Sequence, residues 1–166
     1  MKSKIEIMSR ETMKDLMDSG FPGNTAVISF YDPPQGRGKL IIPSEPLNYN
    51  GVCGRVFQVE IHDIDLETLL DYGLSYEAYF PEADALAEFI CSAVEDGVNI
   101  ICQCEYGQSR SAACAAAIRE HFDRSGIDIF ADYRYCPNQM IFNKLRAALD
   151  KRDGERRKYE ETCIPC

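Results

Sequence analysis

The 166-residue sequence predicts an α/β fold in which a central, mainly parallel sheet lies between layers of helices. Short apolar segments rich in β-branched residues alternate along the chain with segments of helical periodicity, which is the order expected of a parallel sheet and its crossover helices. Glycine and proline residues separate these segments, as they do at element boundaries. The length suits one hydrophobic core, so we expect a single domain over residues 1–166.

The first part of the chain has the pattern of three strands and one helix. The strands are predicted, from their apolar or alternating pattern, at residues 4–8 (an edge strand), 25–30 (a central strand) and 55–61. Ser9 is placed to cap a helix that Gly20 ends, because serine accepts hydrogen bonds from the first turn and glycine commonly ends helices. Residues 31–38 and 43–54 are rich in turn-forming residues, and we predict them as loops.

The second part of the chain adds helices around one more strand. We predict a short helical stretch at residues 66–70 and a longer helix that begins near Pro81 and ends at Gly97. The buried face of that longer helix is expected to comprise Ala85, Leu86, Phe89, Ile90 and Val94. Pro137 opens a further helix, and residues 151–166 are predicted as a charged C-terminal tail, either a solvated helix end or a frayed terminus.

Residues 99–118 (NIICQCEYGQSRSAACAAAI) combine a strand, a tight loop and a helix. The apolar run at Ile100 and Ile101 predicts a short buried strand, and the Ala-rich run at residues 112–118 predicts a buried helix. The connection at residues 104–110 has a glycine at its centre. Because the first turn of a helix has unpaired N–H groups and the positive end of the helix dipole, this arrangement predicts an anion-binding loop.

The residue types in this loop suit chemistry on phosphorus. Cys104 lies at the start of the loop, where amides and the helix dipole favour the thiolate over the thiol. Arg110 lies at its end, and a guanidinium can hold two oxygens of a tetrahedral anion. The pair therefore predicts a nucleophilic sulfur facing a bound oxyanion. The alternative is a buried structural thiol beside a surface arginine.

The segment from Cys104 to Ser111 resembles the Cys-x5-Arg-Ser/Thr phosphate loop of the cysteine-dependent protein tyrosine phosphatase superfamily, in its dual-specificity form. The resemblance is clear at residues 100–118, fair at 57–65 and 136–145, and faint before them. It implies a protein tyrosine phosphatase-like, three-layer α/β/α fold. One residue departs from the pattern: the family usually places histidine before the cysteine, where it helps orient the loop and tune the thiolate, and this chain has Gln103. We therefore expect a retuned site.

The resemblance also implies roles for individual residues. Cys104 is expected to attack phosphorus, and Ser111 to donate a hydrogen bond to the sulfur as it leaves. The phosphoryl oxygens are expected to be held by the loop residues Glu105, Tyr106, Gly107, Gln108, Ser109 and Arg110. Asp63, at the end of a strand that can neighbour the strand of Cys104, is expected to be the general acid, and Asp65 is its rival. A further alternative is that both carboxylates only cap a turn.

The net charge, the N-terminal residues and the cysteine spacing indicate which classes of partner and which cellular compartment to expect. The net charge of −9 disfavours nucleic acid and anionic membranes, and together with Glu105 in the loop it favours phosphopeptides or small monophosphates over highly phosphorylated substrates. The N-terminal residues 1–17 carry charges throughout and have no signal-peptide core, so we expect a cytoplasmic protein. The eight cysteines are irregularly spaced, which favours reduced thiols; the C-terminal Cys163 and Cys166 could form a disulfide or resolve an oxidised Cys104.

The sequence therefore favours a phosphatase that hydrolyses phosphomonoesters through a phosphocysteine intermediate, acting on phosphotyrosine or with dual specificity. The expected substrate is a phosphorylated protein or a small phosphomonoester, and the chemistry implied by the resemblance needs no metal or other cofactor. The main alternative is a phosphate-binding module with little or no turnover, which the unusual Gln103 favours. Sulfur transfer on a rhodanese-like loop also uses a cysteine at a helix N-terminus, but it does not account for Arg110 followed by Ser111.

Overall fold

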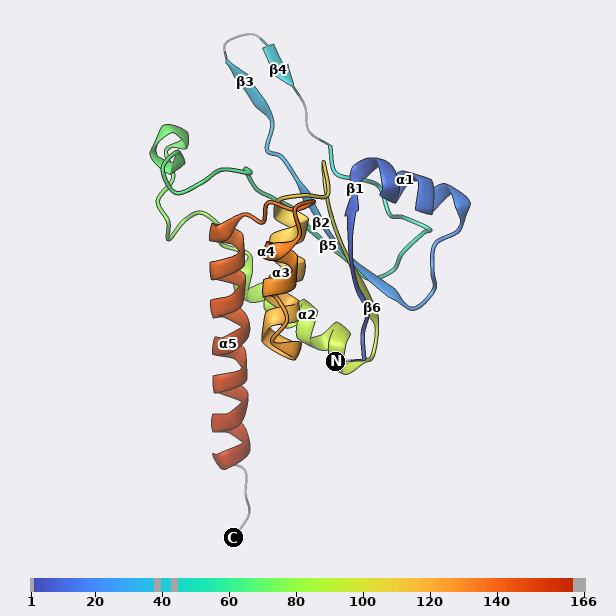
Figure 1. Cartoon of the computed structure of the whole chain (residues 1–166), viewed down its shortest axis with the longest axis vertical. Coiled ribbons are helices and arrows are strands. Elements are labelled where there is room, and N and C mark those ends of the chain that lie inside the picture. The colour runs from blue at the N-terminus through green and yellow to red at the C-terminus, as the bar shows by residue number, and fades with distance from the viewer. Residues whose placement is uncertain (1, 38–39, 43–44, 163–166) are drawn as a thin grey trace.

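The computed structural model describes residues 2–37, 40–42 and 45–162, and within them a parallel sheet lies between helices (Figure 1). The sheet has four strands in the order β1 (Ile5–Ser9), β6 (Asn99–Cys104), β2 (Thr25–Tyr31) and β5 (Val56–Glu60). All neighbouring pairs are parallel. The helices are α1 (Arg10–Ser19), α2 (Ala83–Glu95), α3 (Arg110–Asp123), α4 (Ile127–Ala131) and α5 (Gln139–Thr162).

The two faces of the sheet are covered by different helices, which confirms the predicted three-layer α/β/α class. Alternate residues of β2 and β6, such as Ile28 and Cys102, pack into a large core with α2, α3 and α5. Their neighbours Val27 and Ile101 pack on the opposite face with Met13 of α1. This alternation follows from the period of two in a β-strand, and it lets a strand buried on both faces be apolar almost throughout.

Helix α3 lies directly against the sheet, because its side chains are small. Residues 112–118 are fully buried, and six of these seven residues are alanine or cysteine. Small side chains let the helix backbone approach the sheet closely, and α5 then packs over its outer side (Figure 1). The N-terminus of α3 is thereby held at the carboxyl end of β6.

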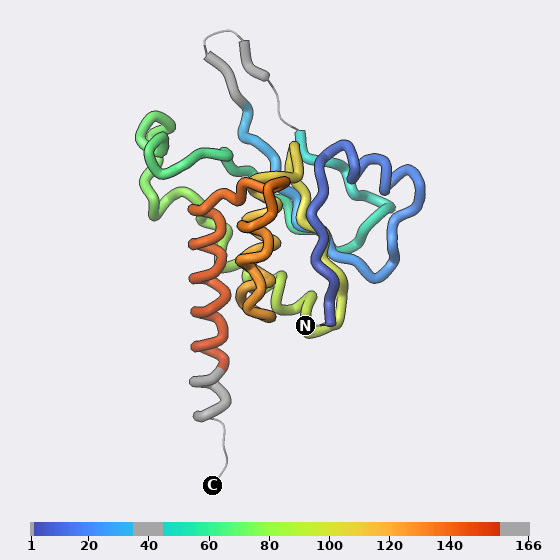
Figure 2. Tube along the Cα trace, in the orientation of Figure 1, coloured from blue at the N-terminus to red at the C-terminus, as the bar shows by residue number. Residues whose placement is uncertain are grey.

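The carboxyl ends of the parallel strands meet at one edge of the sheet (Figure 2). In the register, Tyr31 of β2 lies beside Glu60 of β5, and Ser29 lies beside Gln103 of β6. The residues that follow these strands are Asp32, Ile61 and the loop after Cys104. They converge at the edge where ligands gather in open α/β sheets.

Several details differ from the sequence predictions. β3 (Gln35–Arg37), inside the predicted loop at 31–38, forms an antiparallel pair with β4 (Leu40–Ile42), which lies between the two predicted loops. The sequence left open that β5, the strand that leads to Asp63, lies beside β6. It does not, because β2 lies between them. The predicted helical stretch at 66–70 is a 3-10 helix, η1 (Leu69–Tyr72). Ala85 is exposed, because the buried stripe of α2 passes through Ala83, Leu86, Ala87 and Ile90.

The charged C-terminal stretch continues α5 as far as Thr162. Ion pairs join this part of the helix to α2: Lys151 to Asp84, Arg152 to Glu88, and Arg156 to Glu95. Cys163 and Cys166, for which a disulfide or a resolving role was expected, lie outside the described residues. Among the helices that the structure describes, none is both long enough and apolar enough to cross a bilayer.

Candidate active site

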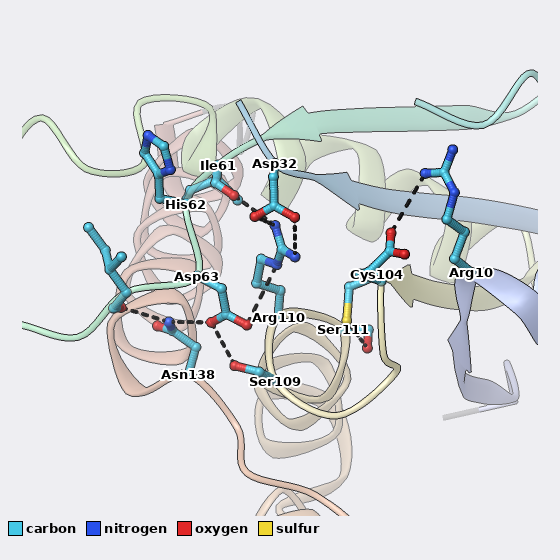
Figure 3. Close-up of polar contacts among 12 residues, drawn as sticks. Arg10, Asp32, Ile61, His62, Asp63, Cys104, Ser109, Arg110, Ser111 and Asn138 are labelled. Carbon is cyan, nitrogen blue, oxygen red and sulfur yellow. Dashed lines mark hydrogen bonds and ion pairs between the residues drawn. The ribbon is translucent and has the colours of Figure 1, made fainter. Parts of the chain in front are cut away.

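The thiol of Cys104 lies at the point where β6 ends and the predicted phosphate loop begins. Its Sγ is 3.0 Å from the Ser111 Oγ in the first turn of α3, so sulfur and hydroxyl share a hydrogen bond (Figure 3). Cys104 is 2% exposed and Ser111 is fully buried. The structure thus brings together the predicted nucleophile and the hydroxyl predicted to support it.

The loop between them is anchored by close backbone packing at Gly107. This residue has a φ of 70°, and a Cβ placed on it would meet the backbone nitrogen of Ser9 at 2.7 Å and the carbonyl carbon of Met8 at 2.9 Å. Only glycine fits such an approach. The amide of Arg10 also donates to the carbonyl oxygen of Glu105 at 3.0 Å. The loop is therefore held against the junction of β1 and α1.

The guanidinium of Arg110 is buried and paired with a carboxylate that the sequence analysis placed in a loop. Its Nη1 and Nη2 donate to Oδ1 and Oδ2 of Asp32 at 2.8 and 3.0 Å, a bidentate pair. The Nη1 also donates to the carbonyl oxygen of Ile61 at 2.9 Å. Arg110 is 3% exposed, and its Nε has no hydrogen-bond partner in the described part of the chain.

Asp63 is held beside Arg110 by two donors (Figure 3). Its Oδ1 accepts from the Ser109 hydroxyl at 2.7 Å and from the Asn138 Nδ2 at 3.0 Å. Its Oδ2 is 3.7 Å from the Arg110 Nε, within ion-pair range. Ser109 is the N-cap residue of α3, but its hydroxyl serves Asp63 and does not cap the helix. The carboxylate therefore faces the phosphate loop from the segment that follows β5, although β2 lies between β5 and β6.

The segment that carries Asp63 is fixed from behind by two further side chains. Asn138 donates to the carbonyl oxygen of Ile64 at 2.9 Å, and its own Oδ1 accepts from the amide of Ile141 at the start of α5. The hydroxyl of Tyr79 donates to the carbonyl oxygen of His62 at 2.7 Å. Burial, together with the charge of Asp63, raises the pKa of Tyr79 well above its usual value, so this hydroxyl remains a neutral donor.

Asp65 is placed differently from Asp63. Both residues are exposed, but the Oδ1 of Asp65 accepts from the backbone amide and the hydroxyl of Thr68 at 3.0 and 2.9 Å. These hydrogen bonds lower the pKa of Asp65 because they favour the carboxylate. Asp65 is thus the cap of a turn, and of these two carboxylates only Asp63 contacts the loop and Arg110 within the described part of the chain.

Gln103 lies on the opposite face of β6 from the thiol. Its Oε1 accepts from the Ser29 hydroxyl at 2.6 Å and from the Tyr49 hydroxyl at 3.3 Å, and Gln103 is 1% exposed. Burial raises the pKa of Tyr49, so its hydroxyl stays protonated and keeps donating. The residue before the nucleophile is therefore tied by neutral hydrogen bonds into the layer that α1 covers.

Asp32 and the full role of Asn138 were not found from the sequence. Asp32 follows the central strand directly, at its carboxyl end, and that position was a usable signal. The contact of Asp32 with Arg110 could be predicted only with the strand order, which places β2 between β6 and β5. Asn138 lies just before α5, and its hydrogen bond to the Asp63 carboxylate links the start of that helix to the site.

Comparison with known proteins yields structural neighbours but no sequence relatives. No family model and no curated protein sequence matches the chain. Similar solved structures include a leucine rich repeat and phosphatase domain containing protein from Entamoeba histolytica, with 12% identity, a TM-score of 0.48, and coverage of 92% of this chain and 90% of that chain. Human DUSP28 has 16% identity, a TM-score of 0.46, and coverage of 91% and 94%. PTPMT1 in complex with PI(5)P has 12% identity, a TM-score of 0.47, and coverage of 92% and 94%. The Entamoeba histolytica protein carries a phosphatase domain beside its leucine rich repeat.

Proposed function

We propose that this chain is a cysteine-dependent phosphatase that hydrolyses phosphomonoesters. The observation that carries the proposal is the set of contacts around one loop. The Cys104 thiol shares a hydrogen bond with the Ser111 hydroxyl, and the buried Arg110, which precedes Ser111, lies within ion-pair range of the Asp63 carboxylate. Each member supplies one requirement of phosphoryl transfer through a covalent intermediate, namely a nucleophile, a cation for the oxygens, and a proton donor.

In the first step the Cys104 thiolate attacks phosphorus and the P–O bond to the leaving group breaks. The loop amides and Arg110 bind the equatorial oxygens, over which negative charge spreads in the transition state. Asp63 in its carboxylic acid form transfers its proton to the leaving oxygen, which would otherwise depart as an alkoxide or phenoxide. The products of this step are an alcohol or phenol, a phosphocysteine and the Asp63 carboxylate.

In the second step the same carboxylate acts as the base. Asp63 takes a proton from a water molecule whose oxygen attacks phosphorus, and the P–S bond breaks to release inorganic phosphate. The Ser111 hydroxyl, 3.0 Å from the sulfur, donates a hydrogen bond to the departing thiolate. At the end of the cycle the thiolate and the protonated acid are restored, so no other reactant is consumed.

The substrate we propose is a phosphoprotein or a small phosphomonoester. The net charge of −9 and the exposed Glu105 in the loop disfavour substrates that carry several phosphates. Tyr106, which is 79% exposed in the same loop, offers an aromatic surface to a phosphotyrosine ring or to an apolar neighbour of the phosphorylated residue. We propose phosphotyrosine or dual specificity on this basis.

Turnover of a small aryl phosphate at mildly acidic pH tests the proposal. We expect the wild type to hydrolyse it and Cys104→Ser to be inactive, because a serine hydroxyl in this loop is a far weaker nucleophile. Cys53→Ser is the matched control: its thiol donates to the carbonyl oxygens of Thr25 and Arg55 away from the loop, and a hydroxyl can do the same. Acid-quenched wild type should carry phosphate on Cys104 by mass spectrometry.

The rival function, a phosphate-binding module without turnover, predicts a different result in the same experiment. The wild type would then release no phenol, although calorimetry would still detect binding of inorganic phosphate. The side chain of Gln103, at the place where the family that the loop resembles usually has histidine, is the observation that favours this rival. Retention of activity in Cys104→Ser would contradict both functions.

A further inference from the structure

The hydrogen bonds of the Arg110 guanidinium leave one of its edges free. A guanidinium has five N–H groups and two edges that can each bind two oxygens: the end-on edge of Nη1 and Nη2, and the side-on edge of Nε and Nη2. Asp32 occupies the end-on edge at 2.8 and 3.0 Å, and the carbonyl oxygen of Ile61 takes the second hydrogen of Nη1. The hydrogens not used by these bonds are the Nε–H and one on Nη2.

The free edge is buried and its Nε–H has no acceptor, as expected of a group whose acceptor is a ligand. Arg110 is 3% exposed, and its Nε has no hydrogen-bond partner among the described residues. The nearest acceptor shown is the Asp63 Oδ2 at 3.7 Å, beyond hydrogen-bond length. A buried N–H without a partner is costly, so its persistence at this position needs an explanation.

We propose that Asp32 is a positioning residue that holds Arg110 by its end-on edge and thereby turns the side-on edge toward the phosphoryl oxygens. A bound phosphate then takes the Nε and the free Nη2 hydrogen, and it replaces Asp63 as the anion nearest to Nε. Asp63 keeps its hydrogen bonds from Ser109 and Asn138. Asp32 itself does not touch the substrate; it acts through Arg110.

The energetics of ion pairs favour this role over a purely stabilising one. Charge burial is expensive, and buried ion pairs can often be replaced by apolar residues without loss of stability. A bidentate pair does, however, fix the plane and direction of the guanidinium, which a single point contact cannot do. Asp32 and Ile61 follow neighbouring parallel strands, so the clamp is built on rigid elements of the sheet.

Phosphate binding without turnover tests the role, which rests on the proposed function but is measured apart from it. In a Cys104→Ser background we expect Asp32→Asn to weaken binding of inorganic phosphate by about tenfold or more in titration calorimetry. Asp96→Asn is the matched control, because Asp96 pairs with Arg55 at 2.8 Å beyond the end of α2. We expect the control to leave the affinity unchanged.

A double-mutant cycle separates positioning from a general effect on the fold. Arg110→Lys removes both guanidinium edges, so Asp32→Asn added to it should cost little further affinity. Asp32→Glu, which keeps the charge, should recover part of the loss, and it replaces Asp32→Asn in the cycle if that variant does not fold. Unchanged or tighter phosphate binding in Asp32→Asn, or an equal loss in the Arg110→Lys background, would overturn the proposal.

The same measurements distinguish failure of this role from failure of the proposed function. A wild type that binds phosphate but hydrolyses no aryl phosphate would refute the phosphatase while leaving the affinity test of Asp32 intact. A phosphatase whose phosphate affinity is insensitive to Asp32→Asn would refute the positioning role alone. A chain that binds no phosphate at all would refute both.

Discussion

The carboxyl edge of the sheet and the outer length of α5 are both held by pairs of opposite charge, but the pairs differ in burial. At the sheet edge, Arg110 is 3% exposed and its partner Asp32 is 26% exposed. Along α5, Lys151 and its partner Asp84 are 57% and 64% exposed, and Arg156 is 55% exposed. The hydrogen-bond lengths are similar in the two regions, so length alone does not distinguish them.

This contrast predicts which charged contacts affect turnover if the proposed function holds. Water screens the α5 pairs, and exposed pairs of this kind contribute roughly 0–1 kcal/mol each. At the sheet edge the Arg110 guanidinium is shielded from water, so an unpaired N–H on it is costly, and its direction is fixed by Asp32 and by the carbonyl oxygen of Ile61. Ionic interactions at the sheet edge should therefore control turnover, and those along α5 should have small effects on stability only.

The largest expected effect is on turnover, from Asp63→Asn. An amide cannot supply a proton to the leaving oxygen, so we expect kcat for phenyl phosphate to fall by about 10²- to 10³-fold. The loss should be smaller for an aryl phosphate whose phenol is strongly acidic, because that phenolate leaves without protonation. Steady-state kinetics with the two substrates measures both effects.

Asp65→Asn is the control for this experiment. Hydrogen bonds from Thr68 lower the pKa of Asp65, so its carboxyl loses its proton at a lower pH than usual and is ionised under conditions where a general acid must be protonated. An asparagine retains the side-chain oxygen that caps the turn. We expect unchanged kinetics; a slow Asp65→Asn beside a normal Asp63→Asn would reassign the acid.

The next effect concerns stability at the base of the site, from Gln103→Leu. Ser29 and Tyr49 are 1% and 5% exposed, and both would lose the Oε1 acceptor without gaining water. We expect the free energy of unfolding to fall by about 2 kcal/mol in urea denaturation. Tyr49→Phe, which removes only the longer bond, should cost less. Equal stability of Gln103→Leu and wild type would show that this buried network contributes nothing.

The fold was largely predictable because its signals are local. Ser9 caps α1 and Gly20 ends it, as their positions indicated, and alternating apolar residues marked β5. The misassigned Ala85 shows the limit of periodicity. A helical pattern is compatible with several neighbouring buried faces, and packing against α5 and the sheet determines which residues of α2 are buried. The β3–β4 pair lies in a segment whose proline and glycine residues favoured a loop.

The site was predictable where its residues are close in sequence and not where they meet through the sheet. The resemblance of the segment from Cys104 to Ser111 to a phosphate loop implied the thiol–hydroxyl pair, which the structure shows at 3.0 Å. The pairing of Arg110 with Asp32 joins residues 78 positions apart, and it depends on β2 lying beside β6. Sequence patterns identify strands but not their order, so the expected neighbour of β6 was the wrong strand.

Asn138 provides a smaller and more local test of the sheet edge. Asn138→Ala removes the donor to Asp63 and to the carbonyl oxygen of Ile64, and we expect kcat to fall by about tenfold because the acid loses its fixed position. The variant should also lose about 1 kcal/mol of stability, since the Oδ1 that accepts from the Ile141 amide is gone. Kinetics and thermal denaturation measure the two losses separately.

Asn138→Ser separates these two roles. Serine can cap a helix but is too short to keep both bonds to the Asp63 segment. We expect near-normal stability with kcat still reduced. A variant that recovers activity along with stability would mean that Asn138 acts only as the cap of α5.

The smallest expected effect comes from α5, with Arg152→Gln. Arg152 pairs with Glu88 at 2.9 Å and with Glu95 at 3.4 Å, and these two carboxylates raise its pKa. We expect a loss below about 1 kcal/mol that shrinks between about 0.05 and about 0.5 M NaCl, because Glu88 and Glu95 are 63% and 48% exposed and salt screens their attraction for the half-buried Arg152. Urea denaturation at the two salt concentrations, with Glu88→Gln and the double variant completing a cycle, measures the pair itself. Steady-state kinetics should be unchanged. A loss of about 2 kcal/mol or more, or a change in kcat/KM, would show that the α5 pairs are coupled to the sheet edge, and the division between the two regions would fail.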